Sequence, residues 1–218
     1  MAEQKITQTT FSISEAIRFG WEIAKKNLWF FVAMLLVTET IGLVTSFIYQ
    51  PMIKSNDILV ILLGIILFII SGIIKLEISF AQLSIYFKFA DKKKASIKDL
   101  FVYFDTKLLF RYFLINFLLI LIIFVGLLLF IVPGIYLGLK YWFVPYIYVD
   151  KRTGIIESFK ESAKLSQGIK KQLFFLGLLQ ILIQIGGLLA LLVGLFIAIP
   201  INYLSDIYVY RKLSKTIK

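Results

Sequence analysis

Long apolar segments alternate with short polar ones along the whole chain. Several apolar segments run for about 20 residues with at most one charge, which is the length that an α-helix needs to cross ~30 Å of hydrocarbon. The stretch from Leu173 to Tyr210 is too long for one such helix and suits two, with a turn around Gly194. The pattern predicts six transmembrane helices, over residues 28–49, 58–80, 109–130, 133–149, 173–192 and 195–210.

Three further segments have the period of an amphipathic helix lying on a membrane surface. The predicted interfacial helices span residues 12–26, 96–108 and 154–170. Ser12 and Glu15 form a capping box at the start of the first, and Ser96 and Asp99 repeat that spacing in the second. The apolar side of the third consists of Ile156, Phe159 and Ala163. Each interfacial helix precedes one hairpin, so we expect an all-α, polytopic membrane protein of three parallel repeats, forming one integral membrane domain over residues 1–218.

The composition supports a membrane protein. Apolar residues make up 60% of the 218 residues and the mean hydropathy is +0.89, whereas soluble domains average about 45–50% apolar residues. The sequence contains no Cys and no His. Disulfides are therefore excluded, and so are zinc sites and nucleophile–base pairs built from those residues. We expect no metal and no cofactor.

The formal charge of +11 is distributed as in a membrane protein rather than a nucleic-acid-binding protein. Of the 24 Lys and Arg residues, all but Lys54, Lys75 and Lys140 fall in four clusters that the hairpins separate. With six spans, the four clusters and both termini share one side, and the positive-inside rule makes that side cytoplasmic. We expect a multi-pass protein of the cell membrane whose basic loops contact the lipid bilayer, with anionic headgroups as candidate ligands.

A few polar residues fall at mid-membrane depth in this arrangement. Glu39 and Lys140 each lie about 15–17 Å from the predicted cytoplasmic edge, and an unpaired charge there costs at least about 2.5–3.5 kcal/mol. We therefore expect an ion pair between them. The candidate midplane polar cluster comprises Glu39, Lys140, Gln180, Gln184 and Asn116. Its functional interpretation is a site for a polar solute or ion, and its structural interpretation is hydrogen bonding between helices.

Residues 133–168 carry a resemblance to a known family. The segment reads PGIYLGLKYWFVPYIYVDKRTGIIESFKESAKLSQG, with a Pro-Gly, an apolar span containing a proline, an acidic turn and a charged helix. Over residues 132–212 it resembles an uncharacterised bacterial integral-membrane family related to the membrane domain of glycerophosphoryl diester phosphodiesterase. The resemblance implies an architecture. It does not carry phosphodiester hydrolysis, because that activity belongs to a separate barrel with catalytic histidines.

Three classes of function are compatible with these features. We expect a non-enzymatic membrane protein that acts at the lipid phase or the inner leaflet as a scaffold or accessory. The alternative is a transporter of a small solute or ion that uses the midplane cluster. An intramembrane enzyme is disfavoured, because nothing in the sequence brings together two of the carboxylates Glu39, Glu77 and Asp206. Asp206 lies five residues from Arg211, and we expect it to have a structural role near the inner interface.

Overall fold

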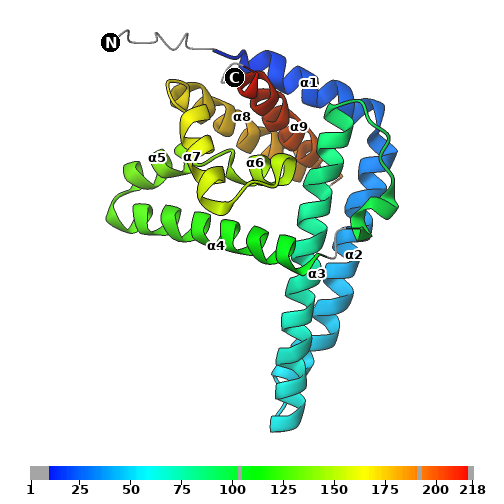
Figure 1. The fold of residues 1–218 in the computed structure, drawn as a ribbon. Helices are drawn as coiled ribbons and strands as arrows, with labels where there is room; N and C mark the ends of the chain where they lie inside the picture. The colour runs from blue at the N-terminus through cyan, green and yellow to red at the C-terminus, as the bar shows by residue number, and fades with distance from the viewer. Residues whose placement is uncertain (1–9, 103–104, 191–192, 216–218) are drawn as a thin grey trace.

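The structure, a computed structural model, describes residues 10–102, 105–190 and 193–215. This part of the chain is helical and contains no strand (Figure 1). The elements are α1 (Ile13–Lys26), α2 (Leu28–Ile53), α3 (Ile58–Ala90), the 3₁₀ helix η1 (Ile97–Phe101), α4 (Thr106–Leu129), α5 (Ile131–Lys140), α6 (Val144–Lys151), α7 (Ile155–Leu165), α8 (Lys170–Leu189) and α9 (Leu195–Ser214). Among the described residues, four helices are long and apolar enough to cross a membrane, namely α2, α3, α4 and α8.

The helices α2 and α3 form a long antiparallel hairpin that extends well beyond the other helices (Figure 1). Asp57 caps α3 by accepting a hydrogen bond from the backbone N–H of Leu59 at 2.8 Å. Two side-chain hydrogen bonds join the helices, from Gln82 Nε2 to Thr38 Oγ1 and from Ser71 Oγ to Thr45 Oγ1, each 3.0 Å long. The predicted helices over 28–49 and 58–80 are therefore confirmed, and both continue past their predicted ends.

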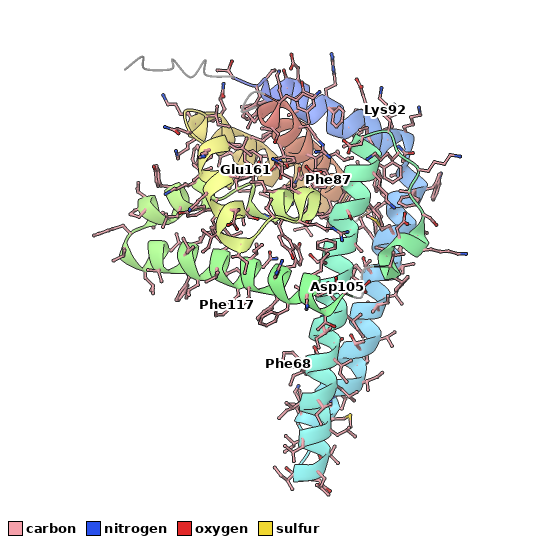
Figure 2. All side chains as sticks on the ribbon, viewed as in Figure 1. Phe68, Phe87, Lys92, Asp105, Phe117 and Glu161 are labelled. Atoms are coloured by element: carbon pink, nitrogen blue, oxygen red, sulfur yellow. The ribbon has the colours of Figure 1, made fainter. Side chains whose placement is uncertain are left out.

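The helix α4 starts beside α3 and runs away from this hairpin rather than along it (Figure 1). Its first turns meet the middle of α3, where the hydroxyls of Tyr112 and Ser79 lie 3.3 Å apart. The predicted arrangement of six spans as three hairpins is therefore not confirmed. Phe68 on α3 and Phe117 on α4 point away from the bundle and are about half exposed, at 53% and 52% (Figure 2).

The interfacial helix predicted over 12–26 forms as α1 and packs against α9. Its N-cap is Ser12, whose hydroxyl accepts from the backbone N–H of Glu15 at 3.4 Å. A Cβ at Gly20 would lie 2.5 Å from the backbone oxygen of Ile201 and 2.6 Å from Ser205 Oγ. Only glycine lets the two helices approach this closely. The buried face of α1 is therefore covered by protein.

The prediction of one interfacial helix over 96–108 is wrong. In its place, a capping box between Ser96 and Asp99 starts only the short η1. Asp105 then caps α4, because its carboxylate accepts from the backbone N–H groups of Lys107 and Leu108. Because Asp105 caps a new helix, α4 begins at Thr106, two residues before the predicted end of the interfacial helix. Residues 103–104 between them lie outside the described part of the chain.

The predicted span over 133–149 is also wrong, because its helix breaks in the middle. The break covers Tyr141, Trp142 and Phe143, between α5 and α6. Pro145 lies in the first turn of α6, where a proline is tolerated, whereas in the interior of one continuous helix it would remove a backbone hydrogen bond. With ten and eight residues, α5 and α6 are each too short to cross a membrane.

Serines of α7 satisfy the backbone groups at this break. The N–H of Phe143 donates to Ser162 Oγ at 3.1 Å, while the carbonyl of Lys140 accepts from Ser162 at 3.2 Å and from Ser166 at 2.9 Å. The helix predicted over 154–170 ends at Leu165, and it buries Ser158 and Ser162. The face that packs against the protein therefore contains these two serines, whereas Ile156, on the apolar side predicted to lie on the membrane surface, is 65% exposed.

The last hairpin turns near Gly194, as predicted. A Cβ at Gly187 would lie 2.9 Å from the backbone carbon of Gly194, so α8 and the start of α9 cross at two glycines. Residues 191–192, the predicted end of the fifth span, lie outside the described part of the chain. The helix α9 is the central element of the core, with buried residues along most of its length from Ala198 to Leu213.

Candidate functional site

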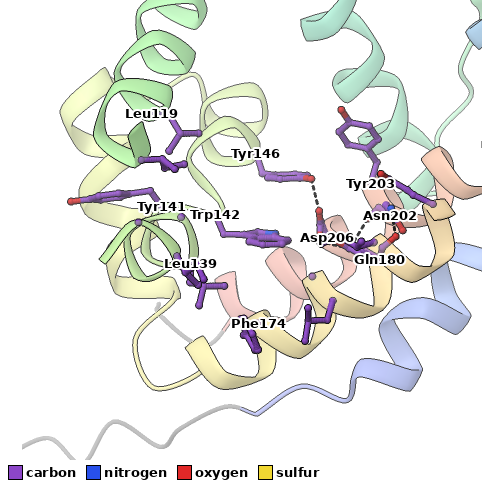
Figure 3. Close-up of a pocket in the computed structure, with 18 of the residues that line it drawn as sticks. Leu119, Leu139, Tyr141, Trp142, Tyr146, Phe174, Gln180, Asn202, Tyr203 and Asp206 are labelled. Atoms are coloured by element: carbon purple, nitrogen blue, oxygen red, sulfur yellow. Dashed lines mark hydrogen bonds between the residues drawn. The ribbon is translucent and has the colours of Figure 1, made fainter. Parts of the chain in front are cut away.

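An open cavity of about 740 Å³ lies between α4, α5, α8 and α9. Apolar side chains form most of its wall: Leu119, Ile123, Leu127, Leu139, Phe174 and Ile181. Gly138 and Gly177 line it as well, and at Gly138 a larger residue would find open space, because its Cβ would meet only Ile123 at 3.9 Å. The break between α5 and α6 supplies Tyr141 and Trp142 to the lining (Figure 3). The cavity is therefore built by the same backbone break that the serines of α7 stabilise.

One end of the cavity is polar and centres on Asp206. Its carboxylate accepts a hydrogen bond from the Tyr146 hydroxyl at 2.7 Å and from Gln180 Nε2 at 2.8 Å (Figure 3). The Trp142 ring lies beside it (Figure 3). Asp206 is 6% exposed, and none of the ion pairs among the described residues includes it. A buried carboxylate is stable when hydrogen bonds satisfy it, and here uncharged donors do so.

Asn202 adds an acceptor to this end of the cavity. Its amide nitrogen donates to the carbonyl of Gln180 at 3.3 Å, and its carbonyl oxygen, Oδ1, is buried with no hydrogen-bond partner within the described residues. The side chain is 7% exposed. A buried acceptor without a donor is unfavourable by about 1–3 kcal/mol. A ligand that donates a hydrogen bond would remove this penalty.

The structure divides the predicted midplane cluster among several places. Gln180 and Gln184 line the cavity, as their spacing on α8 requires. Asn116 on α4 donates to the backbone carbonyl of Tyr112 at 2.8 Å, which is a bond within its own helix. Glu39 lines a different groove, between α2 and α3. Lys140 lines a third hollow beside Phe159 of α7.

The expected ion pair between Glu39 and Lys140 is not formed among the described residues. The expected depth of Lys140 assumed one continuous helix down to Asp150, and the break at Tyr141 removes that assumption. Instead, Lys140 Nζ lies 5.1 Å from the ring centroid of Tyr141, at the last residue of α5. A cation at a helix C-terminus is favoured by the helix dipole and by the aromatic face.

Sequence reasoning missed Asp206, Tyr146 and Asn202 as site residues. Asp206 was expected close to the inner interface because of its distance from Arg211. One feature of the sequence points to this site: Asn202 and Asp206 are four residues apart, so they lie one turn apart on the same face of the buried helix α9. The partner Gln180 lies 26 residues earlier, and Tyr146 lies 60 residues earlier. No local spacing connects them.

A separate charged junction lies at the C-terminal end of α9. Arg211 at the end of α9 bonds both Asp91, which follows α3, and Asp150 of α6. Burial by itself lowers the pKa of Arg211, but the hydrogen bonds and the attraction of the two carboxylates outweigh it and raise the pKa above its ordinary value. Arg211 therefore remains a cation that joins three helices.

No known family model matches the chain, and no curated protein or solved structure shows significant similarity to it. The resemblance of residues 132–212 to a bacterial membrane family therefore stays a prediction. What the structure establishes, for residues 10–102, 105–190 and 193–215, is a helical fold with four helices long and apolar enough to cross a membrane.

Proposed function

We propose that this chain is a non-enzymatic, multi-pass membrane protein that holds an amphiphilic, lipid-like molecule in the cavity between α4, α5, α8 and α9. The observation that carries the proposal is the combination of an apolar wall with a buried, acceptor-rich end at Asp206 and Asn202. Ligand sites are commonly apolar cavities of about 300–1,000 Å³ with a few placed polar groups. The volume of about 740 Å³ lies in that range.

The polar end favours a particular type of headgroup. Gln180 and Tyr146 donate to Asp206, and the buried oxygen of Asn202 has no donor among the described residues, so what this end of the cavity offers a ligand is acceptors. The favoured head is therefore an amine or a hydroxyl. A carboxylate head would place like charges together in a poorly solvated site, which is unfavourable.

The placement in the membrane is part of the same proposal. The basic loops and both chain termini face the cytoplasm, and the turn at Lys54 faces the other side, as the positive-inside rule requires. Although neither α5 nor α6 is long enough to cross alone, we propose that the two together cross as one discontinuous segment, and that α9 is the sixth segment. Irregular backbone at membrane depth is tolerated where protein covers it, and the serines of α7 cover this break.

The test measures binding of three amphiphiles that share one C18 chain: oleylamine, monooleoylglycerol and oleate. We expect native mass spectrometry of the purified protein to detect bound oleylamine and monooleoylglycerol and at least tenfold less oleate. Gly138→Leu would fill the cavity and lower binding, since a Cβ there meets only Ile123 at 3.9 Å and the rest points into open space. Gly186→Leu on α8 is the matched control, because nothing lies within 4 Å of its Cβ and it does not line the cavity. Equal binding by wild type and Gly138→Leu would contradict the proposal.

A second candidate is a transporter of a small solute or ion. The discontinuous pair α5–α6 favours it, because broken helices often form the central sites of transporters. Transport requires that Gln184 be reached by water from each side in turn. Since the chain has no Cys, a Gln184→Cys variant can be labelled with an impermeant maleimide from either side of oriented vesicles. Labelling from both sides favours transport, and labelling from neither favours the lipid-holding function.

A further inference from the structure

A polar groove of about 480 Å³ lies along one side of the α2–α3 hairpin, away from the cavity described above. Its polar lining residues come from one face of each helix: Thr38, Glu39, Ser46, Tyr49 and Gln50 on α2, and Lys75, Ser79 and Gln82 on α3. The spacing of 39, 42, 46, 49 and 50, and of 75, 78, 79 and 82, is the helical one. The polar stripe is therefore continuous along the hairpin.

The rest of the hairpin is strongly apolar and exposed. On α3, Ile65, Ile66, Ile69, Ile70 and Ile73 are each between 41% and 56% exposed. In a protein whose hairpin crosses a membrane, lipid covers these side chains. A stripe that exposes two charges to lipid is unfavourable, because the hydrocarbon cannot solvate them. The stripe therefore requires a polar cover.

The two charges in the groove have opposite signs and lie about one helical turn apart along the hairpin. The Cε of Lys75 is 3.6 Å from a Cβ placed on Gly42, which is one turn from Glu39 on α2. Both Glu39 and Lys75 are exposed, and neither takes part in any ion pair among the described residues. The groove thus presents one negative and one positive group, both available to a partner.

We propose that this groove is the interface at which two copies of the chain pair in the membrane, with Glu39 of each copy bonding Lys75 of the other. A two-fold axis parallel to the hairpin brings α2 of one copy against α3 of the other. Glu39 of each copy then faces Lys75 of the other, offset by about one helical turn, which the long lysine side chain can span. Two-fold interfaces are self-complementary in this way. The amide and hydroxyl groups of the stripe then hydrogen-bond across the interface, as polar residues between membrane helices do.

The decisive experiment uses charge exchange between two differently tagged copies. In the E39K variant both groove charges are positive, and in the K75E variant both are negative. Each variant alone should co-purify with its own kind at least tenfold less than wild type does. Co-expressed, the two variants should associate again, because every contact between them is then between opposite charges. An ion pair within one chain would give no such preference, so failure of the mixed pair to associate would overturn the proposal.

Disulfide crosslinking in native membranes provides a test that needs no charge change. The chain has no Cys, so a single introduced Cys reports only its own position. Ser46→Cys, in the groove, should form a crosslinked dimer on oxidation. Ile48→Cys is the matched control, because it lies at nearly the same depth on the outside of α2 and is 52% exposed. If each variant stayed monomeric on oxidation, or if Ser46→Cys crosslinked to a different protein, the proposal that two copies pair would be overturned.

Discussion

Arg211 holds Asp150 with two parallel hydrogen bonds, from Nη1 to Oδ2 at 2.7 Å and from Nη2 to Oδ1 at 2.8 Å. The same guanidinium bonds Asp91 through Nε and Nη2, at 3.1 and 2.8 Å. It therefore joins the ends of α3, α6 and α9, which lie far apart in the sequence. Such bidentate bonding requires the planar fork of an arginine.

Replacing Arg211 by Lys should weaken this junction although the charge is kept. A lysine cannot bond both carboxylates with paired donors, and hydrogen bonds to charged groups contribute about 1.5–3 kcal/mol each. Because the side chain is 31% exposed, we expect a total loss of about 1–3 kcal/mol of unfolding free energy in detergent. Thermal unfolding of the purified protein measures it. Lys215→Met, an exposed change nearby, should leave the midpoint where it is, and an unchanged midpoint for Arg211→Lys would contradict the role of the fork.

The break between α5 and α6 should depend on Ser162 more than on Ser166. Ser162→Ala removes the acceptor of the Phe143 N–H, which is buried, and an unsatisfied buried donor costs about 1–3 kcal/mol. Ser166→Ala leaves the carbonyl of Lys140 with Ser162 as a donor, so the loss should stay below about 1 kcal/mol. Chemical unfolding of both variants compares them directly. The reverse order would show that the serines do not satisfy the break as the structure indicates.

The contact of α1 with α9 should not tolerate a side chain at Gly20. Its Cβ would lie 2.5 Å from the backbone oxygen of Ile201, and a backbone atom cannot move aside as a side chain can. We expect Gly20→Leu to destabilise the protein by about 1–3 kcal/mol or more, the usual cost of overpacking. Gly72→Leu on α3 meets nothing within 4 Å and is the control. Hydrogen exchange measures the effect locally. The α1 amides should exchange faster in Gly20→Leu than in wild type, and Gly72→Leu should leave their exchange unchanged.

The attachment of α1 should weaken in acid. The hydrogen bond from Tyr208 and then the hydrogen bond and charge of Lys212 lower the pKa of Glu15 below its usual value of 4.5. A carboxylate with a lowered folded-state pKa stabilises the fold above pH 4.5 and loses that contribution as the pH falls through the lower value. At pH 7 the α1 amides should therefore be protected from hydrogen exchange more strongly in wild type than in Glu15→Gln. This difference in protection should vanish in strong acid. A difference that grows on acidification would contradict this sign.

The ends of the α2–α3 hairpin should lie on opposite sides of the membrane. Lys54 follows α2 at one end of the hairpin, and Lys93 follows α3 at the other. In the Cys-free chain, Lys54→Cys should react with an impermeant maleimide added to intact cells. Lys93→Cys should react only after the cells are opened, because the positive-inside rule predicts that the basic loops face the cytoplasm. Equal labelling of both in intact cells would refute this topology.

The sequence alone determined the helical, apolar nature of the chain and most helix positions. The caps at Ser12 and Ser96, the turn at Gly194 and the long segments of α2, α3 and α8 depend on neighbouring residues, so local patterns reveal them. The tertiary structure decided what those helices do. It splits the 133–149 segment because Ser162 and Ser166, which lie 19 to 26 residues beyond the groups that they bond, satisfy the N–H of Phe143 and the carbonyl of Lys140. It separates Glu39 from Lys140 and joins Asp206 to Gln180 and Tyr146, because side-chain partners are set by helix packing over long sequence distances, which no local period records.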